Sequence, residues 1–133
     1  MAVILLVEDD VVTQVLVKNL LTSEGHTVQI AHNGEDALET LKSSNNMEIL
    51  VTDVMMPGMD GRELIKKINE DKTIQEMPII IMSGIIKSSE VWGLLDSGAT
   101  YFIPKPVKQD VLRDYISLCI KDCELLRAKK EKA

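Results

Sequence analysis

The sequence lacks several features that mark common classes of protein. It has only two cysteines, Cys119 and Cys123, which are too few to build a metal site. We therefore expect buried free thiols in a reducing cytoplasm. No apolar stretch approaches the length that spans a bilayer, so we expect no membrane insertion. The first residues carry no cationic leader and reach acidic residues too early for a signal peptide.

An excess of basic residues is also missing. The net charge of −6 disfavours nucleic-acid binding, and no basic stripe interrupts the chain before its tail. Hydrophobic residues make up 45% and charged residues 27% of the 133 residues, a composition typical of one globular domain. We expect this domain at residues 1–128 and a frayed, charged tail at residues 129–133, with no direct nucleic-acid partner.

Short apolar runs alternate with amphipathic segments along the whole chain. The apolar runs predict strands at Val3–Val7, Thr27–Ala31, Ile49–Asp53, Ile79–Ser83 and Tyr101–Ile103. The amphipathic segments predict helices at about Val11–Ser23, Glu35–Ser44, Arg62–Asn69, Ser88–Ser97 and Lys108–Arg127. This alternation indicates a parallel sheet covered on both faces. We predict an α/β fold with five helices and a doubly wound five-stranded parallel sheet of order 2-1-3-4-5, the flavodoxin-like arrangement.

Polar residues follow four of the expected strands at their carboxyl ends. Glu8 and Asp9 follow the first strand, Asp53 ends the third, Ser83 ends the fourth and Lys105 follows the fifth. In a doubly wound sheet, the ligand crevice lies at the carboxyl ends of the strands. We therefore expect these side chains to converge on one site.

The carboxylates of this set indicate a site for a divalent cation. Carboxylates gathered from two strand ends repel one another unless a cation neutralises them, and Mg²⁺ prefers oxygen ligands. Asp53 stands alone after the central strand and is the better nucleophile toward phosphorus, whereas Glu8 and Asp9 are better suited to hold the ion. Lys105 would offset charge on phosphoryl oxygens, and the Ser83 hydroxyl would donate a hydrogen bond to one of them.

Four segments in register carry a family resemblance. They are Leu6–Asp10 (LVEDD), Val51–Gly61 (VTDVMMPGMDG), Pro78–Gly84 (PIIIMSG) and Gly98–Pro106 (GATYFIPKP). In order and spacing they cover essentially the whole chain, which resembles the receiver domain of two-component response regulators.

The resemblance implies a function and a set of roles. It implies Mg²⁺-dependent transfer of a phosphoryl group to Asp53 from a histidine kinase or a histidine phosphotransfer protein. Asp9 and Asp53 would bind the metal directly, Glu8 mainly through water, and the Met55 backbone carbonyl would be a further ligand. The domain would not be an enzyme for another substrate, because it would catalyse only its own phosphorylation and dephosphorylation. Lys105–Pro106 is expected to be a cis peptide bond.

The resemblance also implies a conformational switch. The hydroxyl of Ser83 and the aromatic ring of Phe102 would move together on phosphorylation. The change would reach the face built from the expected helix Ser88–Ser97, strand Tyr101–Ile103 and helix Lys108–Arg127. A downstream protein or a second copy of the chain would bind there. In the family, the positions of Met55 and Ile85 flank the path of the hydrolytic water, and both are apolar here, which predicts a long-lived phosphorylated state.

Outside the site, individual side chains have simpler expected roles. Asp10 is expected to cap the first helix through its side chain. The helix Val11–Ser23 is expected to bury Thr13, Leu16, Val17, Leu20 and Leu21 and to expose Val11, Val12 and Val15, which would receive the kinase or phosphotransfer partner. Trp92 is expected to serve packing.

Three other functions compete with that of a phosphoaccepting switch. A flavodoxin-like cofactor binder shares the fold class, but Glu8-Asp9-Asp10 would repel its phosphate. A phosphatase or mutase with an aspartyl nucleophile needs a second acid two residues later, where this chain has Met55. A receiver-like interaction module without phosphoryl turnover is the remaining alternative. Incubation with a small phosphodonor and Mg²⁺ separates these functions.

Overall fold

The chain folds into a single parallel sheet between two layers of helices. The computed structural model describes residues 1–44, 46–84 and 88–132. Its strands are β1 (Val3–Val7), β2 (Thr27–Ala31), β3 (Ile49–Asp53), β4 (Ile79–Ser83) and β5 (Tyr101–Pro104). Its helices are α1 (Val11–Ser23), α2 (Gly34–Ser43), α3 (Gly61–Glu70), α4 (Ser88–Asp96) and α5 (Gln109–Lys132). The strand order β2-β1-β3-β4-β5 confirms the predicted doubly wound α/β fold.

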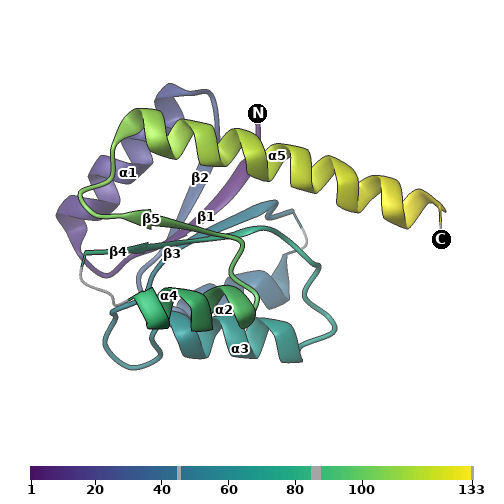
Figure 1. Ribbon diagram of the computed structural model, residues 1–133, viewed down its shortest axis with the longest axis horizontal. Coiled ribbons are helices and arrows are strands. Elements are labelled where there is room, and N and C mark those ends of the chain that lie inside the picture. Colours follow the sequence, from purple (N-terminus) through teal and green to yellow (C-terminus); the bar gives the residue numbers. More distant parts are fainter. Residues whose placement is uncertain (45, 85–87, 133) are drawn as a thin grey trace.

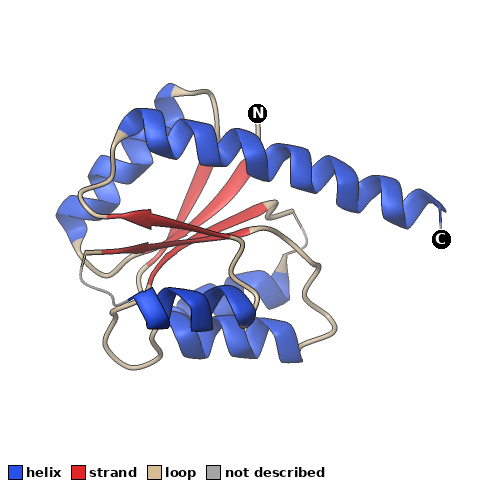
Figure 2. Cartoon of the chain, viewed as in Figure 1, coloured by secondary structure: helices blue, strands red, loops and turns tan. Residues whose placement is uncertain are grey.

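The two faces of the sheet carry separate hydrophobic cores. Helices α1 and α5 cover one face, and α2, α3 and α4 cover the other (Figures 1 and 2). Alternate residues of β1, β3, β4 and β5 face opposite cores, as Leu5 and Leu6 of β1 do, whereas the edge strand β2 exposes Thr27 and Gln29. Both faces are therefore apolar, which explains why the strands are near-continuous apolar runs.

Helix α5 extends beyond the length expected from the sequence. Leu112, Ile116 and Cys119, spaced three or four residues apart, are buried against the sheet. The helix continues past Arg127 to Lys132, so the expectation of a frayed tail was wrong over that stretch. No glycine or proline follows Arg127 to end the helix, and the charged residues there are good helix formers. The end of α5 projects past the sheet (Figure 1).

The buried face of α1 differs in phase from the expected one. Gln14, Val17 and Leu21 are its buried residues, whereas Leu16 is 46% exposed, which corrects the expectation that Leu16 is in the core. Trp92 on α4 was also expected to pack, but it is 69% exposed. In both cases no neighbouring element of the described residues covers the side chain.

Cys119 is buried and Cys123 is partly buried, and both thiols are free, as expected. Among the described residues, no helix combines the length and the apolar character needed to cross a membrane.

Candidate functional site

The carboxyl edge of the sheet continues its backbone hydrogen bonds into the loops, which fixes the residues that follow each strand. The Glu8 N–H donates to the Ala31 carbonyl at 3.1 Å, beyond the last residue of β1. The Lys105 N–H donates to the Ser83 carbonyl at 2.9 Å, beyond the last residue of β5. Glu8 and Lys105 are therefore held almost as firmly as strand residues.

Asp53 lies at the end of the central strand with both carboxylate oxygens engaged. The side chain is nearly buried, at 8% exposure. The Val54 N–H donates to Oδ1 at 2.8 Å, and Lys105 Nζ lies 3.1 Å from Oδ2. The Thr52 hydroxyl donates to the Asp53 carbonyl at 2.9 Å. These contacts orient the carboxylate toward the open edge of the sheet.

Lys105 joins the acidic residues of two different strands. Its Nζ lies 3.2 Å from Glu8 Oε1 as well as 3.1 Å from Asp53 Oδ2. Burial acts to lower the pKa of the Lys105 ammonium, but hydrogen bonds and charges of Asp53 and Glu8 outweigh burial and raise the pKa above its usual value. Lys105 therefore stays protonated at neutral pH. The Lys105–Pro106 bond is cis, which confirms that prediction.

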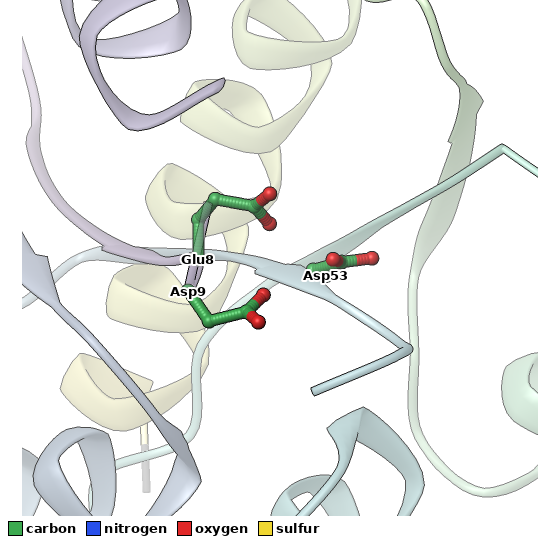
Figure 3. Close-up of side chains that lie close together, drawn as sticks. All are labelled: Glu8, Asp9 and Asp53. Atoms are coloured by element: carbon green, nitrogen blue, oxygen red, sulfur yellow. The ribbon is translucent and has the colours of Figure 1, made fainter. Parts of the chain in front are cut away.

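Glu8, Asp9 and Asp53 form the acidic cluster that the sequence predicted (Figure 3). Each offers a carboxylate oxygen, and these oxygens lie within 4.8 Å of one another. Asp9 is exposed, whereas Glu8 and Asp53 are buried. Burial, followed by the neighbouring Asp53 carboxylate, raises the pKa of Glu8 from 4.5 to about 7.

One carboxylate oxygen of the acidic cluster lacks a hydrogen-bond partner in the described part of the chain. Glu8 Oε2 is buried and has no hydrogen-bond partner among the residues that the structure describes. Buried carboxylate oxygens ordinarily have a partner, because an unpaired one carries the full cost of lost hydration. A hard divalent cation accepts such oxygens as ligands and neutralises neighbouring carboxylates. The residues present therefore fit a Mg²⁺-type ion.

Asp10 stays outside the cluster, as expected. Its side chain accepts hydrogen bonds from the Thr13 N–H at 2.9 Å and the Thr13 hydroxyl at 2.7 Å. These bonds cap the amino terminus of α1 and hold the pKa of Asp10 below its usual value.

The loop between β3 and α3 approaches Asp53 so closely that it requires glycine at one position. A Cβ atom at Gly61 would lie 2.5 Å from the Asp53 carbonyl oxygen. The Gly61 N–H donates to the Val54 carbonyl at 2.8 Å and closes the loop. Met55, in the same loop, has a side chain that is 69% exposed. The sequence contained Gly61 within a motif but gave no sign of this steric role.

The two expected switch residues lie on neighbouring strands. Ser83 is 3% exposed at the end of β4. Phe102 of β5 is partly buried and packs against the core on the side of α2, α3 and α4. Ile85, expected to flank the path of water, lies outside the described residues.

Gln14 is a residue of the site that the sequence analysis missed. Its Nε2 donates to the Glu8 carbonyl at 2.5 Å from a buried position on α1. The available signal was its spacing, because Gln14 precedes the buried Val17 by three residues and Leu21 by seven. A polar residue in phase with a buried stripe calls for a polar partner in the interior.

Comparisons with known proteins agree with this geometry. Residues 4–117 match the response regulator receiver domain family. The two-component response regulator ORR5 of Oryza sativa subsp. japonica is 37% identical over 111 residues, which is 83% of each chain. A chemotaxis protein CheY homolog of Campylobacter jejuni subsp. jejuni is 35% identical over 112 residues, which is 84% of this chain and 86% of that protein.

Solved structures show the same fold. A response regulator receiver domain protein from Clostridium thermocellum superposes with a TM-score of 0.87 at 25% identity, covering 95% of this chain and 99% of that chain. A CheY-like receiver domain protein from Methanospirillum hungatei JF-1 gives a TM-score of 0.84 at 27% identity, covering 93% of this chain and 97% of that chain.

Proposed function

The chain belongs to the response regulator receiver domain family, and we propose that it is a signalling switch in which Asp53 accepts a phosphoryl group from a phosphohistidine partner. One observation carries the proposal. Asp53 ends the central strand between the Val54 N–H and the Lys105 ammonium, beside the carboxylates of Glu8 and Asp9. A carboxylate held in this way is fixed in position, paired with the Lys105 ammonium and located at the carboxyl edge of the sheet.

The acidic cluster supports Mg²⁺ as the cofactor. Asp9 and Asp53 would bind the ion directly, Glu8 would bind through water, and the Met55 carbonyl would complete the protein ligands. Bound Mg²⁺ would neutralise the carboxylates and offset negative charge on the phosphoryl oxygens. Burial, and after it the neighbouring Asp53 carboxylate, raises the pKa of Glu8, and a bound cation would offset both effects by neutralising the carboxylates.

The transfer step exchanges one bond to phosphorus for another. A carboxylate oxygen of Asp53 bonds to phosphorus as the phosphorus–nitrogen bond of the phosphohistidine breaks. The imidazole leaves with the electron pair of that bond and takes up a proton from solvent. Lys105 Nζ, which lies 3.1 Å from Asp53 Oδ2, would offset the charge of the phosphoryl oxygens. The Ser83 hydroxyl would donate a hydrogen bond to one of them.

The switch would begin at β4 and end on the face formed by α4, β5 and α5. The Ser83 carbonyl accepts a hydrogen bond from the Lys105 N–H, so a shift of Ser83 toward the phosphoryl group would pull on β5. Phe102, partly buried on β5, would follow by packing inward. The altered face would bind a downstream protein or a second copy of the chain.

Helix α1 supports the docking of a histidine kinase or a histidine phosphotransfer protein. Val11, Val12 and Val15 are 66%, 77% and 53% exposed on the helix that follows Glu8 and Asp9. Neighbouring exposed apolar side chains mark partner surfaces. A helical partner would lay an apolar ridge there and bring its phosphohistidine to Asp53.

Labelling with a small phosphodonor tests the proposal. Acetyl phosphate with Mg²⁺ is expected to add one phosphoryl group per chain, detected by intact mass and lost on mild base treatment. Asp53→Asn should abolish this gain, and chelation of Mg²⁺ with EDTA should suppress it. Asp10→Asn is the matched control, because asparagine also caps helices and should leave labelling intact. Sustained labelling of Asp53→Asn would refute the assignment, and an unlabelled native chain would favour an interaction module without turnover.

A further inference from the structure

Gln14 occupies a position that packing alone does not explain. It is 5% exposed as the fourth residue of α1, where an apolar side chain would ordinarily face the sheet. Its Nε2 donates to the Glu8 carbonyl at 2.5 Å and lies 3.0 Å from His32 Nδ1. His32 follows the last residue of β2, so Gln14 connects the end of β1 with the end of β2.

The chemistry of these partners fixes the orientation of the Gln14 amide. The Glu8 carbonyl can only accept, so the NH₂ group and not the amide oxygen must face it. The second hydrogen of this NH₂ group is then available to His32 Nδ1, which accepts when the proton of the neutral ring is on Nε2. Both donors of one buried group are thereby used.

This arrangement determines how the two acidic side chains are presented. The peptide group between Glu8 and Asp9 is planar, so the direction of the Glu8 carbonyl also sets the position of the Asp9 N and Cα. On its other side, the Glu8 N–H donates to the Ala31 carbonyl at 3.1 Å. Glu8 is therefore fixed through both of its peptide groups, and Gln14 supplies the only one of these two contacts that comes from a side chain.

We propose that Gln14 is a positioning residue for the acidic cluster, and that its hydrogen bond to the Glu8 carbonyl increases the affinity of Glu8, Asp9 and Asp53 for a divalent cation. His32 orients the Gln14 amide. The inference rests on the proposed function in that the cation is taken to be Mg²⁺. Groups that orient metal ligands typically change metal affinity by about 10- to 100-fold when they are removed.

The test compares two substitutions in the same helix. Gln14→Met keeps the length of the side chain and removes the donor, and Asn19→Met makes a similar change at an exposed position of α1. Isothermal titration of the folded proteins with Mg²⁺ should give a dissociation constant about tenfold higher for Gln14→Met and unchanged for Asn19→Met. His32→Ala should weaken binding in the same direction but less.

A second measurement separates positioning from damage to the fold. At Mg²⁺ concentrations that saturate the variant, Gln14→Met should be labelled by acetyl phosphate at the native rate, because only occupancy of the site is impaired. A purely structural role for Gln14 would lower the free energy of unfolding and leave the dissociation constant unchanged. Unchanged Mg²⁺ affinity in Gln14→Met would overturn the proposal.

The failure of this inference is distinguishable from the failure of the proposed function. If the native chain binds no Mg²⁺, the proposed cofactor is wrong, and the predicted effect of Gln14 on Mg²⁺ affinity no longer applies. Nuclear magnetic resonance of the metal-free protein then tests the hydrogen bond from Gln14 Nε2 to the Glu8 carbonyl. The Gln14 side-chain amide protons should exchange with solvent far more slowly than those of the exposed Gln29. Equal exchange would show that Gln14 does not hold the Glu8 carbonyl.

Discussion

Charged side chains at the two edges of the sheet differ in how strongly they are buried. At the carboxyl edge, the carboxylates of Glu8 and Asp53 are buried and contact Lys105 within 3.2 Å. At the amino edge, the segment after α3 and the end of α5 line a groove of about 1080 Å³. Its charged residues are exposed or half-buried and carry both signs: Asp71, Lys72, Glu76, Asp122, Lys129 and Lys130.

The difference in hydration appears in the carboxyl groups of the two edges. Burial raises the pKa of Glu8 to about 7, whereas hydrogen bonds from Thr73 lower the pKa of Asp71. Desolvation makes the carboxyl edge sensitive to a cation, whereas the hydrogen bonds from Thr73 stabilise Asp71 of the groove as an anion. The volume of a groove is therefore a poor guide to reactivity in this fold. A cluster of desolvated charged side chains is a better guide to the reactive site.

Substitution of one lysine at each edge should give the largest difference in the rate of phosphorylation. Lys105→Met should slow labelling by acetyl phosphate about 100-fold at saturating Mg²⁺, because no other cationic side chain contacts Asp53 among the described residues. Lys72→Met, in the groove, should leave the rate unchanged. The rate of phosphoprotein formation measures both. Equal rates for the two variants would remove the distinction between the edges.

The sequence predicted the carboxyl edge better than the surfaces around it. Strands such as Ile49–Asp53 are delimited by continuous apolar runs, and parallel strands bring their carboxyl ends together, so the site followed from the fold. The exposure of Leu16 and Trp92 depends instead on whether a neighbouring element covers that part of a helix. The role of Gln14 depends on a carbonyl that only the folded turn brings within reach. These are tertiary effects that periodicity does not contain.

Mg²⁺ should stabilise the fold through the carboxyl edge alone. An ion that binds the folded cluster, and not the scattered acids of the unfolded chain, adds about 1.4 kcal/mol to the free energy of unfolding at ten times its dissociation constant. Asp9→Ala should abolish this gain, and Glu76→Gln, in the groove, should retain it. Thermal unfolding with and without Mg²⁺ provides the measurement. A melting temperature unmoved by millimolar Mg²⁺ in the native chain would count against the site.

The raised pKa of Glu8 predicts how the carboxyl edge responds to pH. Its folded value of about 7 exceeds its ordinary value of 4.5, so the metal-free folded protein retains a proton that the unfolded chain releases. The free energy of unfolding of the metal-free protein should therefore fall as the pH rises from 4.5 to about 7. Mg²⁺ must displace the same proton, so its affinity should rise about tenfold between pH 6 and pH 8. Glu8→Gln should bind with affinity independent of pH over that range, and a persisting pH dependence would assign the proton to another group.

The surface beside the carboxyl edge should matter to a protein donor and not to a small one. Val15→Lys should slow phosphoryl transfer from a phosphorylated histidine phosphotransfer protein about fivefold, because a charge enters an apolar contact. Labelling by acetyl phosphate should be unaffected. Leu118→Lys adds the same charge at a 42% exposed leucine on α5 and serves as the control. Equal slowing with both donors would mean that Val15→Lys damages the pocket instead of a docking surface.

The smallest expected effect concerns how long the phosphoryl group stays on Asp53. Hydrolysis needs a water held in line with the acyl phosphate, and an oriented water requires a polar side chain beside it. Met55 cannot orient water through a hydrogen bond, and its 69% exposure leaves it without the packing that would fix its position. Met55→Asn should therefore shorten the lifetime about threefold, equivalent to a barrier lower by roughly 0.7 kcal/mol. The decay of purified phosphoprotein in Mg²⁺ measures it, with Ile85→Glu as a second polar substitution and Glu76→Gln as the control in the groove. If neither polar variant accelerates the decay, the apolar side chains at positions 55 and 85 do not set the lifetime.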